Sequence, residues 1–195
     1  MTKAELRRTM RSLIQTIATE DWQRRGAVAC RRLIEQPEFS SARTIMIYLP
    51  MAREAATSPL AVEAWARGKE VCAPRVDWER CELAPIRIHS IETDVCEGAR
   101  GLFEPTGSNV VACSELDLVV TPGLAFDARG GRLGRGAGFY DRFLSQVGFR
   151  GTACGFGLDE QVVEEVPCEA HDVRLALVVS DQRICRVKRE PGGVH

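Results

Sequence analysis

The residues best suited to chemistry lie in one stretch, 122–141, which reads PGLAFDARGGRLGRGAGFYD. Its glycines are Gly130, Gly131, Gly134, Gly136 and Gly138. Glycine permits positive φ and close backbone approach, so several N–H groups can converge on one anion. Arg132 and Arg135 add planar, permanently charged groups that match phosphate oxygens. Asp127 and Asp141 are hard oxygen donors that can hold a magnesium ion. The stretch therefore predicts a phosphate site that can include Mg²⁺.

Two common nucleotide loops are excluded by their spacing. The chain has no GxxxxGKS or GxxxxGKT segment, and its G-x-G-x-G spacing differs from the G-x-G-x-x-G of dinucleotide folds. A wide flexible turn remains the alternative, because glycine-rich loops are common. Three arginines between a strand and a helix favour the anion site over that turn: Arg129, Arg132 and Arg135.

Two amphipathic helices are expected at the N-terminus. Thr2 and Glu5 have the spacing of a capping box, and apolar residues then recur at three- and four-residue steps as far as Ile17. Thr19, followed by two acidic residues, starts a second helix that ends before Pro37. Residues 1–35 carry eight basic and four acidic side chains, and this charge alone favours a solvated basic face over a binding site.

Short apolar, β-branched runs predict strands at 44–49, 69–73, 83–88, 117–121, 152–156 and 175–179. A helix is expected between Ser58 and Gly68. Strands that alternate with helices indicate a single α/β domain, with three αβα layers around a parallel or mixed sheet. We assign 1–188 to this domain and 189–195, REPGGVH, to a frayed C-terminal tail.

Composition limits the partners and the compartment. The 195 residues suit one domain, and 26 basic against 27 acidic side chains give no net field that attracts nucleic acid or anionic lipid. The eight cysteines are at least nine positions apart, which excludes CxxC motifs and favours reduced thiols. The N-terminus resembles no secretory signal, and no apolar run is long enough to span a membrane. We therefore expect a cytoplasmic protein.

Other chemistry-bearing residues add no site. Cys168 and His171 have a metal-pair spacing, yet two ligands without partners make a poor site, so a loop histidine is favoured. The tryptophans are scattered and are interpreted as packing residues: Trp22, Trp65 and Trp78.

The run DLVVTPGLAFDARGGRLGRGAGFYDRFL resembles the signature of the 5-formyltetrahydrofolate cyclo-ligase family, also called methenyltetrahydrofolate synthetases. Further segments resemble the family in the same order, so the resemblance spans nearly the whole chain: KAELR, YLPMAREAATSPL, ARGKEVCAPRV, FEP and VPCEAHDVRLALVV. The resemblance implies ATP- and Mg²⁺-dependent conversion of 5-formyltetrahydrofolate to 5,10-methenyltetrahydrofolate, with release of ADP and phosphate. It also implies a monomer with the fold of sugar-phosphate isomerases and coenzyme A transferases.

The same resemblance implies site residues. ATP would contact two segments, Lys3, Ala4, Glu5, Leu6 and Arg7, and Arg132, Leu133, Gly134, Arg135, Gly136, Ala137, Gly138, Phe139 and Tyr140. The reduced folate would contact Leu49, Glu54 and the inner part of the loop, namely Arg135, Gly136, Ala137, Gly138 and Phe139. Asp141 and Asp172 match metal-associated positions, and Arg135 and Tyr140 are expected to be catalytic.

Three positions depart from the family pattern. Ala137 stands where some members have lysine, so Arg135 must carry more of the phosphate charge. Ala56 replaces a usual acidic residue, and Phe139 replaces a frequent tyrosine.

Two other functions stay open at this point. One is sugar-phosphate isomerisation on the same fold without ATP or magnesium, and the other is a folate- or nucleotide-binding protein without turnover.

Overall fold

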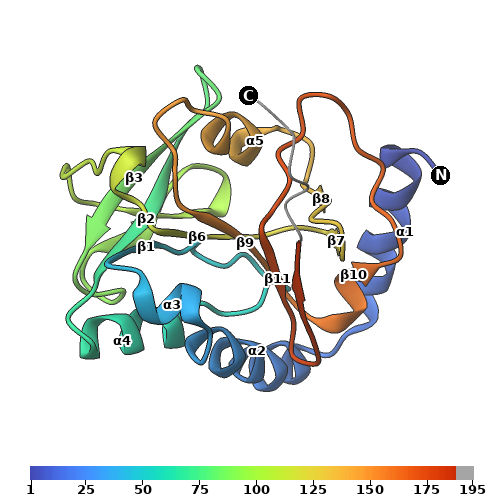
Figure 1. Ribbon diagram of the computed structural model, residues 1–195, viewed down its shortest axis with the longest axis horizontal. Helices are drawn as coiled ribbons and strands as arrows, with labels where there is room; N and C mark the ends of the chain where they lie inside the picture. The colour runs from blue at the N-terminus through green and yellow to red at the C-terminus, as the bar shows by residue number, and fades with distance from the viewer. Residues whose placement is uncertain (188–195) are drawn as a thin grey trace.

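A computed structural model describes residues 1–187 of the chain, and the tail expected at 189–195 lies outside the described residues. Figure 1 shows a central sheet with three helices along one face, a short helix on the other face and the N-terminal helix at one end. The first three are α2 (Thr19–Ile34), α3 (Pro37–Ser41) and α4 (Ser58–Ala66), the short one is α5 (Phe139–Leu144), and the N-terminal one is α1 (Lys3–Thr16).

The central sheet has seven strands in the order β12-β11-β9-β6-β1-β2-β3. Strands β11, β9, β6, β1 and β2 run parallel, and an antiparallel strand closes each edge. The bounds are β1 Thr44–Met46, β2 Glu70–Asp77, β3 Glu82–Ile88, β6 Leu118–Thr121, β9 Thr152–Phe156, β11 Leu177–Val179 and β12 Ile184–Arg186. The chain is therefore a mixed α/β domain around a mostly parallel sheet.

All the expected strands are present, with two shifts that matter for the site. Strand β1 ends at Met46, so Leu49 lies in the loop that follows the carboxyl end of the strand. Strand β2 continues to Asp77 and pairs with β3 to form a long hairpin. Ligands of open α/β sheets bind beyond the carboxyl ends of the parallel strands, which is where these loops lie.

Several small elements were not expected from the sequence. A two-stranded sheet pairs β4 (Val95–Glu97) with β5 (Phe103–Pro105). A three-stranded sheet has the order β10-β7-β8, with bounds Val162–Val163, Ala125–Asp127 and Arg132–Leu133. Single 3₁₀ turns occupy Ala99–Gly101, Cys113–Glu115 and Asp159–Gln161. Runs of two or three residues are too short for periodicity to reveal.

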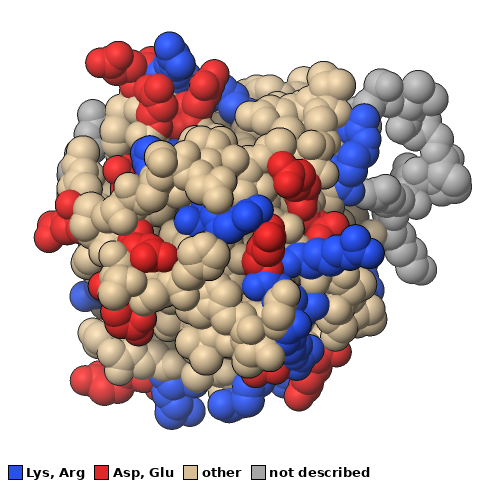
Figure 2. Space-filling model, turned by 90° about the vertical axis from the view of Figure 1, so that its left-hand side faces the viewer, with Lys and Arg blue, Asp and Glu red and all other residues tan. Residues whose placement is uncertain are grey.

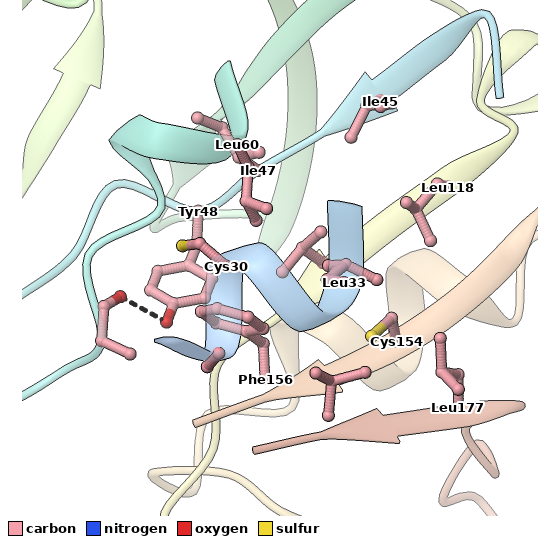
Figure 3. Packing of buried hydrophobic residues seen from close by; sticks show 14 of the residues in the cluster. Cys30, Leu33, Ile45, Ile47, Tyr48, Leu60, Leu118, Cys154, Phe156 and Leu177 are labelled. Carbon is pink, nitrogen blue, oxygen red and sulfur yellow. Dashed lines mark hydrogen bonds between the residues drawn. The ribbon is translucent and has the colours of Figure 1, made fainter. Parts of the chain in front are cut away.

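Side chains along the parallel strands alternate between two apolar clusters, as the period of two requires. One cluster joins the sheet to α1, α2, α3 and α4, and Figure 3 shows its packing around Leu33, Ile45, Leu118 and Phe156. The second cluster, on the opposite face, includes Met46, Val119, Ala153, Val178 and the α5 residue Phe143. Burial of the parallel strands on both faces explains why they read as continuous apolar runs.

The two N-terminal helices form where the sequence predicts them. In α1 the Thr2 side chain accepts from the Glu5 N–H, and the Glu5 carboxylate accepts from the Thr2 N–H, which completes the capping box. Its apolar stripe buries Leu6, Met10 and Ile14. Within residues 1–187, none of the helices combines the length and the apolar character that crossing a bilayer requires.

Candidate active site

A cavity of about 850 Å³ opens beyond the carboxyl ends of the central strands, within the size range of small-molecule sites. Its walls come from α1, the loop after β1, the β2–β3 hairpin, the segment 132–141 and the loop 169–172. The cavity is therefore assembled from segments far apart in the sequence, and Figure 1 places two of them, α1 and the β2–β3 hairpin, on opposite sides of the view.

The segment 132–141 lines the cavity throughout, as the sequence predicts. Gly136 and Gly138 have φ of 120° and 71°, in the region that favours glycine. A side chain at Gly138 would also approach the Arg142 guanidinium to within 3.1 Å. The glycines therefore allow the segment to turn tightly beside the cavity before α5 begins.

Gly130 and Gly131, at the start of the glycine-rich part of the stretch, shape a turn and do not line the cavity. Gly130 and Gly131 lie in the turn between β7 and β8, and a side chain at Gly130 would collide with the Leu175 backbone. Asp127 is fully buried, and its carboxylate accepts from the N–H groups of Arg129, Gly131 and Val166 at 2.8 Å. The interpretation of Asp127 as a metal donor is thus wrong: it holds a turn together, because buried N–H groups need an acceptor.

Arg132 is the buried cation of the cavity wall, with a side chain only 4% exposed. Its Nη2 donates to Oδ2 of Asp141 at 2.8 Å, and its guanidinium carbon lies 5.4 Å from the centre of the Tyr140 ring. Its buried Nε donates to no acceptor in the described part of the chain. Burial raises the pKa of Tyr140 despite the opposing charge of Arg132, so the phenol stays protonated near neutral pH.

Helix α1 supplies the second group of charges. Lys3 Nζ forms ion pairs with Asp172, at 2.6 Å, and with Glu169. Burial opposes ionisation of Asp172, but the hydrogen bond and charge of Lys3 outweigh it and hold the pKa of Asp172 below its ordinary value. Arg7 Nε donates to the carbonyl of Gly134 at 3.1 Å, which fastens α1 to the glycine segment.

Only part of the expected N-terminal contact segment reaches the cavity. Lys3, Ala4 and Arg7 line it together with Thr2. Glu5 and Leu6 do not, because the Glu5 carboxylate caps the helix and Leu6 is buried in the core. The cause is the helix period, which turns residues 5 and 6 away from the face that carries residues 3, 4 and 7.

Glu54 and Leu49 both line the cavity, from the loop after β1. This loop is held firmly: the Tyr48 hydroxyl donates to the Ala55 carbonyl at 2.7 Å, a bond drawn in Figure 3. Oε2 of Glu54 accepts from the Met51 N–H, and Oε1 accepts from Nε and Nη2 of Arg135 at 3.2 and 2.8 Å. The expected folate acceptor and the expected phosphate cation are therefore ion-paired.

An apolar wall completes the cavity, and most of it was missed from the sequence. Trp78 lies at the turn of the β2–β3 hairpin and contacts Phe139 edge to face, with ring centres 5.2 Å apart. Trp78 is thus a cavity residue as well as a packing residue. The remaining apolar lining comes from Pro74, Val76, Leu83, Leu102 and Phe103. The position of Trp78 between two apolar runs, at the hairpin turn, was the sequence feature that could have indicated this wall.

The cavity has two carboxylates at the expected metal positions, Asp141 and Asp172. Each is already paired with a cation, and residues 1–187 contain no group of three or more His, Cys, Asp or Glu side chains arranged to hold a metal. Mg²⁺ is commonly held by one or two carboxylates together with substrate phosphates and water. The residues therefore fit a magnesium ion bound together with a nucleotide.

The cysteines take no visible part in the site. All eight are free, and none lines the cavity. Burial raises the pKa of the Cys30 and Cys72 thiols to about 12, which keeps them protonated and unreactive.

Comparisons with known proteins agree on one family. The model of the 5-formyltetrahydrofolate cyclo-ligase family matches residues 1–181. The chain is 30% identical to the Escherichia coli 5-formyltetrahydrofolate cyclo-ligase over 174 residues, which cover 87% of this chain and 95% of that protein. The mouse enzyme of the same name is 24% identical over 183 residues, covering 89% and 90% of the two chains.

Solved structures give the same result. The NMR structure of Aquifex aeolicus 5,10-methenyltetrahydrofolate synthetase superposes with a TM-score of 0.84 at 30% identity, covering 100% of this chain and 97% of that one. The Mycoplasma pneumoniae 5,10-methenyltetrahydrofolate synthetase, at 20% identity, shares the fold with a TM-score of 0.74 over 93% and 99% of the two chains. The chain belongs to the 5-formyltetrahydrofolate cyclo-ligase family.

Proposed function

We propose that this chain closes the ring of 5-formyltetrahydrofolate to 5,10-methenyltetrahydrofolate by an ATP- and Mg²⁺-dependent route, with the cavity described above as its active site. The observation that carries the proposal is the convergence in one cavity of four cationic side chains, a carboxylate acceptor and an aromatic wall. The cations are Lys3, Arg7, Arg132 and Arg135, the acceptor is Glu54, and the aromatic residues include Trp78, Phe103, Phe139 and Tyr140.

The reaction needs activation of a poor leaving group. The formyl oxygen attacks the γ-phosphorus of ATP, which forms an O–P bond and releases ADP. N10 of the folate then attacks the formyl carbon and loses its proton, and the C–O bond breaks to release phosphate. No protein nucleophile is required, so the chain contributes positioning and charge.

Arg132 and Arg135 are the groups we assign to the transferring phosphoryl. Arg132 is preorganised by Asp141 and Tyr140, and its unpaired buried Nε favours an anionic partner. Arg135 extends from the glycine segment and is 45% exposed, so its guanidinium can reorient toward phosphate. Lys3 and Arg7 place two more charges on the α1 side of the cavity, and the Tyr140 hydroxyl can donate to a reacting oxygen.

The folate is assigned to the part of the cavity formed by the loop after β1 and the β2–β3 hairpin. Glu54 has a side chain only 9% exposed, so it presents a fixed acceptor to the amino and ring N–H donors of a pterin. Leu49 lines the cavity from the same loop, and the edge-to-face pair of Trp78 and Phe139 offers an aromatic surface for the flat parts of the substrate.

Magnesium would be held by Asp141 and Asp172 together with the nucleotide phosphates, and it would supply neutralisation of phosphate charge. In the structure, Arg132 pairs with Asp141 and Lys3 pairs with Asp172. This pairing gives each carboxylate a counter-charge in the cavity wall.

Several wider assignments belong to the same proposal. The coverage of both sheet faces supports three αβα layers of the kind that sugar-phosphate isomerases and coenzyme A transferases share. We assign the described residues, 1–187, to one domain. The protein acts as a monomer in the cytoplasm on a reduced folate, without nucleic acid or membrane partners. The near balance of 26 basic and 27 acidic side chains supports the absence of such partners, and the face shown in Figure 2 carries both signs of charge.

The test is the ultraviolet appearance of methenyltetrahydrofolate from purified protein and 5-formyltetrahydrofolate. Product should form only when ATP and Mg²⁺ are both present, with one ADP released per product. Arg129→Gln is a matched control, since this arginine is 74% exposed, pairs with Glu165 and lies outside the cavity lining. Equal turnover without ATP would overturn the proposed route, and tight binding of folate without turnover would indicate a binding protein.

A further inference from the structure

The ion pair between Glu54 and Arg135 joins two residues that the proposed function assigns to different ligands. The sequence separates them by 81 positions, and the structure brings Nη2 of Arg135 to 2.8 Å from Oε1 of Glu54. Nε of Arg135 donates to the same oxygen at 3.2 Å. These two nitrogens form the edge of the guanidinium that also suits two-point contact with phosphate.

The contacts of Glu54 show that its acceptor capacity is shared. Oε2 accepts from the Met51 N–H at 3.0 Å, and Oε1 accepts both Arg135 bonds. A pterin brings N–H donors that need the same oxygens. Folate at Glu54 and Arg135 at Glu54 therefore compete for one acceptor.

The two partners differ in freedom. Glu54 is 9% exposed and lies in a loop fixed by hydrogen bonds of Tyr48 and Met51. Arg135 is 45% exposed and lies between Gly134 and Gly136, the second of which has φ of 120°. Arg135 is thus the partner that can leave, and phosphate is the competing anion within the same cavity.

We propose that the Arg135–Glu54 ion pair is a latch that couples nucleotide binding to folate binding. This inference rests on the proposed function. A nucleotide phosphate draws Arg135 away and frees the Glu54 acceptor for the pterin, while folate at Glu54 frees Arg135 for phosphate. Because either ligand opens the pair, the second ligand binds without the cost of opening it, and the coupling is the same in both directions.

The experiment measures dissociation constants by isothermal titration with a nonhydrolysable ATP analogue plus Mg²⁺ and with 5-formyltetrahydrofolate. Each ligand is titrated alone and in the presence of the other at saturation. For the wild type, each ligand should tighten the other by the same factor, about 5- to 20-fold, within the usual range of coupling between sites. Arg135→Gln should reduce this factor to about one, because the latch is gone.

Glu54→Gln separates the latch from simple shared contact. The amide keeps the size of the side chain but removes the charge that holds Arg135. The latch predicts that Glu54→Gln binds the nucleotide analogue alone several-fold more tightly than the wild type. If Arg135 merely touches both ligands, nucleotide affinity in this variant should equal that of the wild type, and the latch is overturned.

The control is Arg129→Gln, an arginine in the β7–β8 turn outside the cavity lining, which should keep the wild-type coupling. The outcomes also separate the latch from the function beneath it. Wild-type protein that forms methenyltetrahydrofolate but binds its ligands independently retains the proposed function and loses the latch. Wild-type protein that binds neither ligand and forms no product loses the proposed function itself.

Discussion

At the residue scale, the pairing of Arg132 with Asp141 shapes the candidate phosphate site. A buried guanidinium needs a counter-charge, and Asp141 supplies it from the first turn of α5 at 2.8 Å. Asp141 therefore orients a cation as well as being a candidate magnesium ligand. Its second oxygen makes only a long contact of 3.4 Å with the Val173 N–H.

Asp141→Asn should separate these two roles. The amide removes the charge beside a 4% exposed Arg132, so we expect a loss of unfolding free energy of about 1–3 kcal/mol. If Asp141 also binds the ion, the Mg²⁺ concentration for half-maximal rate should rise severalfold. A magnesium titration of the initial rate, with urea unfolding of both proteins, measures both effects. Unchanged half-saturating Mg²⁺ with lowered stability would limit Asp141 to orienting Arg132.

Tyr140→Phe tests the catalytic assignment of the hydroxyl. The ring and its contact with the Arg132 guanidinium should survive, since the substitution removes one oxygen only. If the hydroxyl donates to a reacting oxygen, kcat should fall by about 10²- to 10³-fold, the scale for losing one preorganised donor. The folate and ATP dissociation constants should change less than threefold. A variant with wild-type kcat would leave Tyr140 as a wall of the cavity.

Residue types and spacing point to the glycine segment, and the resemblance to the cyclo-ligase family adds Lys3, Arg7 and Glu54. Neither shows how these side chains pair. The glycine segment, Lys3, Arg7 and Glu54 were all expected in the site, and all line the cavity. The ion pair of Glu54 with Arg135 spans 81 positions and depends on how two loops meet, which spacing along the chain cannot show. Asp127 was predicted as a metal donor, but its carboxylate is buried at the small sheet of β10, β7 and β8 and accepts backbone hydrogen bonds there. The sequence does not reveal this short sheet.

At the element scale, α1 is fastened to three separate parts of the cavity wall. Lys3 binds the loop 169–172, Arg7 binds the glycine segment, and Arg53 Nη1 donates to the Gln15 carbonyl at the C-terminal end of the helix. Helix α1 has no basic residue in its own last turn, so Arg53 provides that charge from the loop that carries Glu54.

Arg53 is one of two non-glycine residues with positive φ in the described chain, at 63°. Replacing Arg53 by alanine and by glycine therefore tests two effects separately: the cap, which is its hydrogen bond and charge at the C-terminal end of α1, and the strain of its backbone. Arg53→Ala loses the cap and keeps the strain, so we expect a loss of about 1 kcal/mol in unfolding free energy. Arg53→Gly loses the cap but relieves the strain, so it should be more stable than Arg53→Ala by about 1 kcal/mol. Urea unfolding of the three proteins gives both differences, and equal stability of the two variants would contradict the assigned strain.

Long apolar elements are predicted well and short polar ones poorly. The capping box and stripe of α1 and the buried runs of β1, β6 and β9 follow from the sequence, because burial and period leave strong patterns. The expected helix after the glycine segment is only Phe139–Leu144, too short to be a robust anion site by itself. The phosphate assignment consequently depends on arginine side chains more than on a helix end.

At the scale of the whole molecule, an ion-pair network fastens α2 to the sheet edge opposite the β2–β3 hairpin. Arg25 bonds both Glu160 and Asp181, and Arg183 bonds Asp159. Asp181 is 8% exposed, and Arg25 is the cation that its carboxylate accepts from. The network lies outside the cavity lining, so it contributes to stability without touching the proposed chemistry.

This network predicts how stability depends on pH. The hydrogen bond from Arg25 holds the pKa of Glu160 below its ordinary value of 4.5, against the effect of burial. A carboxyl group with a lowered pKa in the folded state stabilises the fold above its unfolded pKa, and this contribution is lost as pH falls through the folded pKa. The contribution of Glu160 should thus be complete at pH 7 and decline below about pH 4.5.

Arg25→Met should remove that contribution at its source. At pH 7 we expect the variant to be less stable than the wild type by about 1–3 kcal/mol, because two carboxylates lose charged hydrogen bonds. At pH 3.5 the difference should shrink, since Glu160 begins to take up its proton in the wild type as well. Arg24→Met is the matched control: its side chain is 72% exposed and pairs with the exposed Asp21, so the change should stay within about 0.5 kcal/mol. Urea unfolding of the three proteins at both pH values measures these differences in unfolding free energy. If the difference for Arg25→Met stays constant with pH, packing of the arginine stem, and not its charge, fastens α2 to the sheet.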